Sequence, residues 1–231
     1  MQIKKRIFTG IVVSAVALGS VMGAGASSLL ENIQAQLNHE IKFELDGKGW
    51  TPKDQSGKRI APISYQGTTY LPVRAVSEAV NVAVDWDSKT KTITLGEKST
   101  SVLITKEPIK KNNRADITTD KAFTIQNGKD YKEGIIIRNL TMSESHTTLI
   151  PNGRYQVASL TLVKVNETNR EVKVKIFNGE TLLKEITLTD AADQNIQNIE
   201  IEIGGIKELK LSMSGETWGE NENVFLTGSY R

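Results

Sequence analysis

Gly67-Thr-Thr-Tyr-Leu-Pro-Val-Arg-Ala-Val-Ser-Glu-Ala-Val80, continued by Asp85-Trp-Asp87 and Thr90-Lys-Thr-Ile-Thr-Leu95, combines a turn, a strand, a short helix and a hairpin. Pro72 stands where a helix can begin, because its missing N–H has no role at the first helical position. Val73, Val76 and Val80 then recur at helical spacing. The stretch predicts one helix packed on a small antiparallel sheet.

The flanking residues extend this sheet. Residues 41–45 alternate apolar and charged side chains and end at Asp46-Gly47, which predicts a strand entering a hairpin. Gln66-Gly67 marks a second hairpin, and residues 82–84 with 92–95 form a third strand pair. Upstream, apolar residues at 29, 30, 33 and 37 predict a short amphipathic helix.

Residues 40–96 resemble the copper amine oxidase N-terminal-like domain, also called the stalk domain. The shared features are the turn glycine, Tyr-Leu-Pro-Val-Arg, Ser-Glu-Ala, Asp-Trp-Asp and Lys-Thr-Ile-Thr-Leu, in that order. Asn81 replaces a helix-ending glycine and tolerates the same left-handed conformation. The resemblance implies a structural or protein-contact module of secreted proteins from Gram-positive-type bacteria.

The resemblance does not imply amine oxidation. A mononuclear copper site needs several imidazoles, and the chain has only His39 and His146. We therefore expect no metal and no cofactor. Within the motif we expect Arg74 to pair with Glu78 or Asp85, Tyr70 to point inward, and Trp86 to cover the core rather than bind a ligand.

The rest of the chain is all-β by pattern. Residues 100–114 are polar and predict a linker, although residues 102–104 could add a strand to the first module. Asn178-Gly179 joins two alternating segments and is the clearest hairpin. The predicted strands are residues 122–126, 135–137, 156–165, 171–177, 182–188, 196–203, 208–213 and 224–227. Short strands at this spacing predict a β-sandwich.

Residues 116–231 also resemble NPCBM-type carbohydrate-binding modules, which are jelly-roll sandwiches. The shared features are Gly-Lys-x-Tyr-x-x-Gly, the Asn-Gly-x-x-Leu hairpin and Gly-Ile-Lys-Glu-Leu-Lys-Leu. The expected fold class is therefore an α+β stalk-type domain followed by an all-β jelly-roll sandwich. The expected parts are a signal peptide (1–26), the stalk domain (27–99), the linker (100–114) and the sandwich (115–231).

The N-terminus predicts secretion. Lys4, Lys5 and Arg6 precede an apolar stretch over residues 7–21, and Ala24-Gly-Ala26 fits signal peptidase, with a membrane anchor as the alternative. We expect no transmembrane segment after cleavage. The mature chain then carries 26 basic and 27 acidic residues, which argues against a nucleic-acid partner. No cysteine is present, so disulfides, thiolate chemistry and a lipidated cysteine are excluded.

Sugar recognition needs an aromatic face beside amides and carboxylates. Trp218 with Glu220, Asn221 and Asn223 offers this set, and Tyr131 and His146 are further candidates. Each aromatic could instead be structural. Asp190, Asp193 or Glu220 could alternatively hold calcium, although no EF-hand spacing occurs.

No hydrolase pattern surrounds the carboxylates, and Ser145-His146 has no identifiable acid partner, so we expect no enzyme activity. The sequence favours a secreted, non-catalytic cell-envelope protein that is free or associated with the cell wall and whose sandwich binds envelope polysaccharide. The alternative is a structural or protein-binding module that contacts another envelope protein and has no affinity for glycans.

Overall fold

The computed structural model describes residues 30–165, 168–216 and 222–231, so the expected signal peptide lies outside the described residues. The chain divides into two compact units, Met1–Ala35 and Gln36–Arg231. Residues 30–35 contain no helix, and strand β1 (Gln36–Leu37) follows them, so the helix expected over 29–37 is wrong in the described part. None of the helices in the described part has the length and apolar composition needed to cross a bilayer.

The N-terminal half of the second unit contains the expected hairpins. Strands β2 (Phe43–Leu45) and β3 (Lys48–Trp50) pair around Asp46-Gly47. Strands β4 (Ile63–Tyr65) and β5 (Thr68–Tyr70) pair around Gln66-Gly67, with β1 beside β4. Strands β6 (Val84–Asp87) and β7 (Thr92–Leu95) form the third pair, so its first strand lies at residues 84–87 rather than at the expected 82–84. Both turn residues of the first two hairpins have positive φ, as type I′ turns require.

Helix α1 (Val73–Ala79) follows Pro72, and Asn81 ends this segment at φ +55°, the left-handed conformation that its sequence position predicts. The packing differs from the expectation. The hairpins form separate small sheets, and Val73, Val76 and Val80 are 38–49% exposed. The helix instead buries the small side chains of Ala75 and Ser77.

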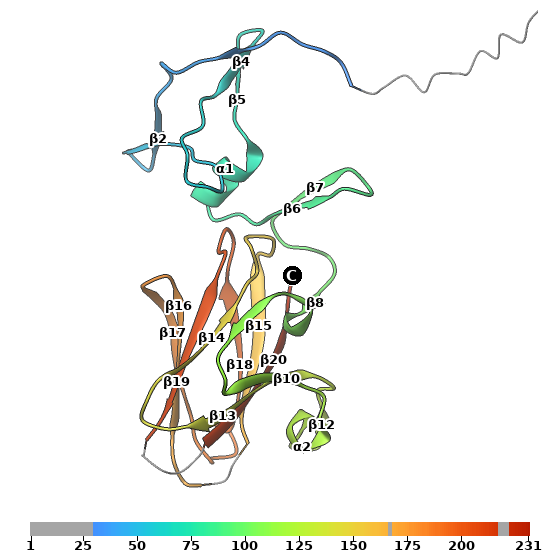
Figure 1. Cartoon of the computed structure of the whole chain (residues 1–231), viewed down its shortest axis with the longest axis vertical. Helices are drawn as coiled ribbons and strands as arrows, with labels where there is room; N and C mark the ends of the chain where they lie inside the picture. Colours follow the sequence, from blue (N-terminus) through green and yellow to red (C-terminus); the bar gives the residue numbers. More distant parts are fainter. Residues whose placement is uncertain (1–29, 166–167, 217–221) are drawn as a thin grey trace, which may run out of the picture. The chain divides into compact units, whose positions relative to one another are not determined.

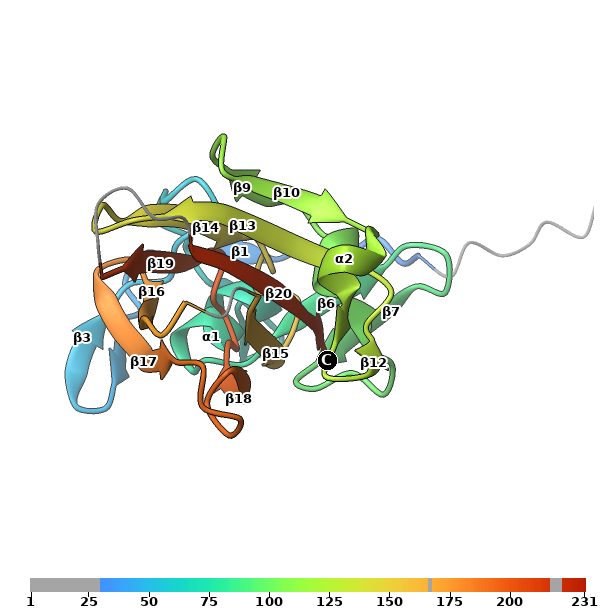
Figure 2. The same ribbon diagram turned by 90° about the horizontal axis from the view of Figure 1, so that it is seen from below.

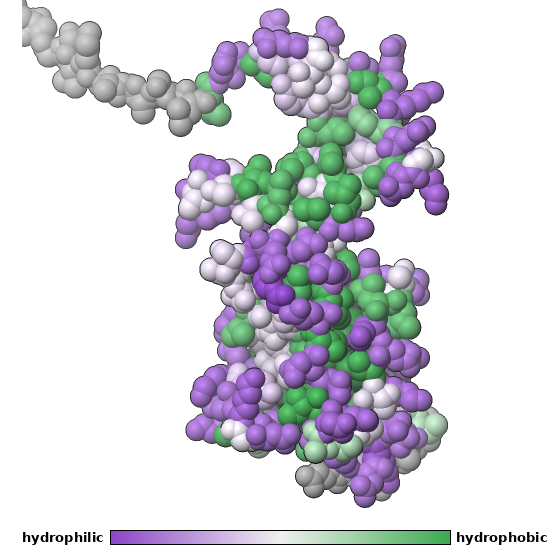
Figure 3. Space-filling view, turned by 180° about the vertical axis from the view of Figure 1, so that it is seen from behind, coloured by the Kyte–Doolittle hydropathy of each residue, from purple (hydrophilic) through white to green (hydrophobic). Residues whose placement is uncertain are grey.

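Tyr70 and Trp86 are also about half exposed, so their expected inward positions are wrong. The cross-strand partners of these residues, Ile63 and Ile93, are exposed as well. Figure 3 shows hydrophobic residues gathered at the surface of this N-terminal part.

The C-terminal half is a sandwich of two antiparallel sheets (Figures 1 and 2). The six-stranded sheet has the order β10-β13-β20-β15-β18, with β8 also paired to β20. Its strands are β8 (Val102–Leu103), β10 (Ala115–Thr118), β13 (Gly134–Leu140), β15 (Val157–Lys164), β18 (Ile196–Glu202) and β20 (Glu222–Tyr230).

The five-stranded sheet has the order β17-β16-β19-β14-β9. Its strands are β9 (Ile109–Lys111), β14 (Ser145–Leu149), β16 (Val172–Asn178), β17 (Thr181–Leu188) and β19 (Leu209–Gly215). Asn178 and Thr181 pair across the predicted Asn-Gly hairpin. The eight strands β13 to β20 can be numbered 1 to 8 along the chain. In these numbers one sheet has the strand order 1-8-3-6 and the other has the order 5-4-7-2. This arrangement of two four-stranded sheets is a jelly roll.

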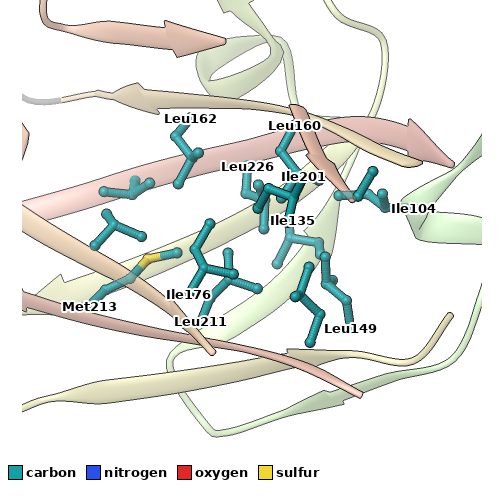
Figure 4. Close-up of a cluster of buried hydrophobic side chains, with 14 of the residues drawn as sticks. Ile104, Ile135, Leu149, Leu160, Leu162, Ile176, Ile201, Leu211, Met213 and Leu226 are labelled. Atoms are coloured by element: carbon teal, nitrogen blue, oxygen red, sulfur yellow. The ribbon is translucent and has the colours of Figure 1, made fainter. Parts of the chain in front are cut away.

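The core lies between the two sheets. Alternate residues of each strand point inward, including Leu160 and Leu162 of β15 and Leu211 and Met213 of β19, and all are at most 1% exposed. Figure 4 shows these side chains meeting between the sheets. The alternation places the neighbouring residues of β15 on the outer surface of the six-stranded sheet.

The segment expected as a linker belongs to the sandwich. Strand β8 pairs with β20, and β9 pairs with β14. Between them a 3₁₀ helix, η1 (Ile104–Lys106), places Ile104 in the core at 0% exposure. Burial of the apolar residues in this otherwise polar segment explains why it is ordered on the sandwich rather than extended as a linker or added to the first module.

Candidate carbohydrate-binding surface

The outer face of the six-stranded sheet carries an apolar row that crosses four neighbouring strands. Phe225 of β20 lies opposite Ile136 of β13 and Val163 of β15, and Val163 lies opposite Ile196 of β18. Ile136, Val163 and Phe225 are at most 1% exposed although they point away from the main core. Other side chains must therefore cover this row.

Tyr131 and Phe123 provide that cover. Helix α2 (Lys121–Thr124) is capped by Asp120, whose side chain accepts a hydrogen bond from the Ala122 N–H at 2.9 Å. Strands β11 (Ile125–Gln126) and β12 (Lys129–Asp130) then form a hairpin that returns the chain to Tyr131. In Figure 1 this α2 segment lies on the side of the sandwich away from β16 and β17. The residues 122–126, expected as one strand, are thus a helical turn followed by a short strand.

The Tyr131 ring packs on Phe225 with 6.1 Å between ring centroids. Lys129 Nζ lies 4.5 Å from the Tyr131 centroid, and the Arg138 guanidinium lies 5.3 Å from that of Phe123. Both aromatic side chains remain partly exposed. The surface therefore combines aromatic faces with cations, which are held there by cation–π attraction.

Polar side chains lie beside the apolar row on the same face of the sheet. Next to the apolar row, Thr161 Oγ1 donates to Asn198 Oδ1 at 2.7 Å. One pair further along, Ser159 Oγ donates to Glu200 Oε1 at 3.1 Å. Arg231 binds both Ser159 and Glu200, and its hydrogen bond, with that of Ser159, lowers the pKa of Glu200.

The segment after Tyr131 connects the aromatic and polar parts of this surface. Thr227 Oγ1 donates to the Glu133 carbonyl at 2.9 Å, and Thr227 lies opposite Thr161 in the sheet. We call Phe123, Tyr131, Thr161, Asn198 and Glu200 the outer-face surface. It presents apolar rings beside hydroxyl, amide and carboxylate groups, which are the groups that a pyranose can contact with its C–H face and its hydroxyls.

Asn223 lies on the same face as Phe225, because both belong to alternate positions of β20. Its side-chain oxygen accepts a hydrogen bond from the Asn139 N–H at 3.1 Å. Asn223 therefore binds the neighbouring strand β13, and that oxygen has a structural role.

His146 lies on the other sheet. It occupies an exposed position of β14 opposite Ser212, and its Nε2 is 4.0 Å from Glu144 Oε2. The flanking Ser145 and Thr147 point inward, so His146 faces outward from the five-stranded sheet. The structure thus brings Tyr131 and Asn223 onto one face and His146 onto the opposite one. Trp218, Glu220 and Asn221 lie outside the described residues.

Of the three residues suggested for calcium, Asp190 has another partner, and Glu220 lies outside the described residues. Lys164 Nζ, with its side chain fully buried, contacts Asp190 Oδ1 and lies 3.5 Å from Glu222 Oε2. Partial burial raises the pKa of Asp190, but the hydrogen bond and charge of Lys164 together with the N–H groups of Asn169 and Thr168 outweigh it, so the net shift is downward. The ammonium supplies the positive charge between these carboxylates. Across the described ranges, no three His, Asp or Glu side chains are grouped to hold a metal.

Phe123, Thr161, Asn198 and Glu200 were not identified from the sequence. The strand pattern placed Thr161 and Asn198 in strands, but only the pairing of β15 with β18 makes them neighbours. Phe123 was assigned to a strand, and no local pattern reveals that it covers another element.

Comparison with known protein families supports the resemblance of the N-terminal part. Residues 54–131 match the family model described as the copper amine oxidase N-terminal domain. The match begins later than the expected residue 40 and continues past residue 96 into the sandwich. No curated protein matches the chain.

Several solved structures with similarity to this chain are carbohydrate-binding modules. One contains the M60 catalytic domain with the CBM51-1 and CBM51-2 domains of Clostridium perfringens ZmpB, at 13% identity and TM-score 0.42, covering 64% of this chain and 17% of that one. This chain thus spans about a sixth of its length. A second is TmCBM61 in complex with β-1,4-galactotriose, at 14% identity and TM-score 0.31, covering 58% and 89%.

A third is CsCBM6-3 from Clostridium stercorarium in complex with cellobiose, at 14% identity and TM-score 0.31, covering 55% and 90% of the two chains. The family match indicates no catalytic family. Residues 54–131 are thus similar to the copper amine oxidase N-terminal domain, and the solved structures resembling the chain include carbohydrate-binding module sandwiches.

Proposed function

We propose that this protein is a secreted, non-catalytic cell-envelope protein that binds envelope polysaccharide through the outer-face surface of its sandwich. One observation carries the proposal: partly exposed Phe123 and Tyr131 lie over an apolar row that continues into the pairs Thr161–Asn198 and Ser159–Glu200. A sugar ring stacked on Tyr131 would place its hydroxyls toward these polar groups.

The surface is also preorganised. Tyr131 is held by its contact with Phe225 and by a hydrogen bond from its N–H to the Thr124 carbonyl at 2.9 Å. The polar side chains are fixed by their cross-strand hydrogen bonds. Groups fixed before binding lose little conformational entropy when a ligand arrives, which favours affinity.

Secretion and association with the wall are part of the same proposal. Their support is the basic and apolar N-terminus followed by Ala24-Gly-Ala26. A polysaccharide in the envelope is accessible to a protein exported by this route.

The second candidate function is protein binding, and the exposed apolar residues of the N-terminal part favour it. Val76, Val80, Trp86, Ile93 and Leu95 are 38–54% exposed. Clusters of exposed apolar residues often mark protein contacts.

Capture from an envelope extract distinguishes the two functions. Immobilised protein is incubated with extract before and after protease digestion, and bound sugar and protein are measured. Under the proposal, digestion leaves capture of polysaccharide intact and Tyr131→Ala abolishes it. Capture that disappears with digestion and is unchanged in Tyr131→Ala would establish the protein-binding alternative.

A further inference from the structure

A polar cavity lies within the unit Gln36–Arg231, and none of its lining residues belongs to the outer-face surface. It has a volume of about 380 Å³ and is lined by Gln55, Arg74, Asn152, Arg154 and Lys207. An adjoining cavity of about 280 Å³ shares Gln55 and Arg74, and Lys53, Asp54 and Glu78 are the other charged residues that line it. Three of the five lining side chains are cationic and two are amides.

Two of the cations are neutralised by acidic partners. Arg154 Nε lies 3.0 Å from Asp85 Oδ1, and its NH1 lies 3.1 Å from Glu107 Oε2. Lys207 Nζ lies 3.3 Å from Glu78 Oε1. These pairs use both carboxylates that the sequence suggested as partners of Arg74.

Arg74 has no carboxylate partner among the described residues. Its NH1 donates to the Val84 carbonyl at 3.2 Å, which fixes the half-buried side chain at the cavity wall. A guanidinium has five N–H donors in a planar fork, so most of its donors are unused by this bond. Paired N–H groups of this kind fit a carboxylate with two parallel hydrogen bonds.

The amide side chains of Gln55 and Asn152 are also available to form hydrogen bonds with a ligand. Both residues are exposed, and neither side chain has a hydrogen-bond partner among the described residues. Amides can both donate to and accept from hydroxyl groups. The cavity therefore combines the Arg74 guanidinium, which forms no ion pair among the described residues, with groups that recognise hydroxyls.

The volume distinguishes a sugar from a bare anion. Small-molecule sites usually measure about 300–1,000 Å³, so this cavity is large enough for one monosaccharide and much too large for a single carboxylate. We propose that the cavity binds an acidic sugar of the hexuronic-acid class. The carboxylate binds Arg74, and the ring hydroxyls bind Gln55 and Asn152. This inference goes beyond the proposed function because it concerns a different surface and specifies a negatively charged ligand.

The test is a titration of the mature chain, residues 27–231, with glucuronate, glucose and acetate. Binding is measured by isothermal titration calorimetry. Glucose keeps the ring without the charge, and acetate keeps the charge without the ring. We expect glucuronate to bind at least tenfold more tightly than either. Equal binding of glucose, or of acetate, would overturn an acidic-sugar site.

Variants locate the site. Arg74→Gln and Arg74→Lys should each weaken glucuronate binding at least tenfold, because neither presents the planar fork. Arg114→Gln is the matched control, since Arg114 also donates to one backbone carbonyl, that of Asn139 at 3.1 Å, but does not line the cavity. Unchanged affinity in Arg74→Gln would contradict the proposal.

Gln55→Ala provides an independent check if Arg74 variants fold poorly, because Gln55 is exposed. It should weaken glucuronate binding several-fold, and an unchanged affinity would argue against the cavity. Tyr131→Ala should leave glucuronate binding intact, so that failure of this inference and failure of the outer-face proposal are distinguishable.

Discussion

Arg154 Nε lies 3.0 Å from Asp85 Oδ1, and this ion pair joins the turn between β14 and β15 to the β6–β7 hairpin. The same carboxylate accepts a hydrogen bond from Lys98 at 2.6 Å. Arg154 also binds Glu107, which accepts a hydrogen bond from Tyr155. The N-terminal part is thus connected to the sandwich by a continuous charged network.

The first prediction concerns Asp85 and pH. Partial burial opposes ionisation, but hydrogen bonds from Lys98 and Arg154 lower the pKa of Asp85 from 3.8 to about 2. A lowered folded-state pKa contributes stability above pH 3.8, and this contribution is lost as the pH falls through about 2. Asp85→Asn should therefore lower the free energy of unfolding by about 1–2 kcal/mol at pH 7, after allowance for solvent screening.

Urea denaturation of the wild type and Asp85→Asn between pH 7 and pH 2 measures this difference. The two proteins should converge at the acidic end. Asp116→Asn is the control, because Asp116 pairs with Lys111 and Arg138 at an exposed position, where solvent screens the ion pairs, and it should change stability much less than Asp85→Asn. A constant difference across the whole pH range would exclude Asp85 ionisation as its source.

The second prediction concerns the buried ammonium of Lys164. Its side chain is 0% exposed, and that of Glu222 is 2% exposed. Lys164→Met leaves Glu222 and Asp190 without this cation and should cost about 3–5 kcal/mol in denaturant unfolding. Adding Glu222→Gln should recover part of the loss, because it removes a buried charge.

Lys173→Met is the matched control, since Lys173 occupies an exposed position of β16. It should change stability by less than about 0.5 kcal/mol. Equal effects of the two lysine substitutions would show that the Lys164 network is not stabilising.

The third prediction concerns Gly204, where the sandwich approaches the end of the α1 segment. A Cβ at this position would lie 2.0 Å from the Asn81 carbonyl oxygen. Gly204→Ala should therefore displace the α1 segment, with amide chemical-shift changes concentrated around Asn81. Gly49→Ala is the control, because nothing lies within 4 Å of its Cβ. Unchanged shifts around Asn81 in Gly204→Ala would contradict this contact.

The fourth prediction concerns export. If residues 1–26 are a signal peptide, protein recovered from the medium of an expressing Gram-positive-type host should begin at Ser27. Intact-mass measurement of the secreted protein checks this. Retention of the full chain in the membrane fraction would instead support the anchor alternative.

The turn residues and strand alternation were sufficient to predict much of the fold. Asp46-Gly47, Gln66-Gly67 and Asn178-Gly179 each specify a local hairpin, and the structure confirms all three. The jelly-roll order follows from pairings between distant strands, and only the resemblance to a family predicted it. Local propensity cannot determine such pairings.

The sequence was less informative where burial depends on distant partners. Val73, Val76 and Val80 have the spacing of a packed helix face, yet they are exposed because the hairpins form separate sheets. Ile104 lies in a polar segment, yet it is buried because β8 and β9 join the two sheets. Tyr131 was identified as a candidate, but its neighbours Thr161 and Asn198 become adjacent to its segment only through strand pairing.

The fifth prediction tests the central proposal most directly. Residues 27–231 are titrated with purified peptidoglycan and wall polysaccharides, as the wild type, Tyr131→Ala and His146→Ala. His146 is the matched control, because it lies on the other sheet and faces away from the outer-face surface. Saturable binding that falls at least tenfold in Tyr131→Ala and is unchanged in His146→Ala is the predicted result. Binding that Tyr131→Ala leaves unaltered, or no binding to any of these glycans, would contradict it.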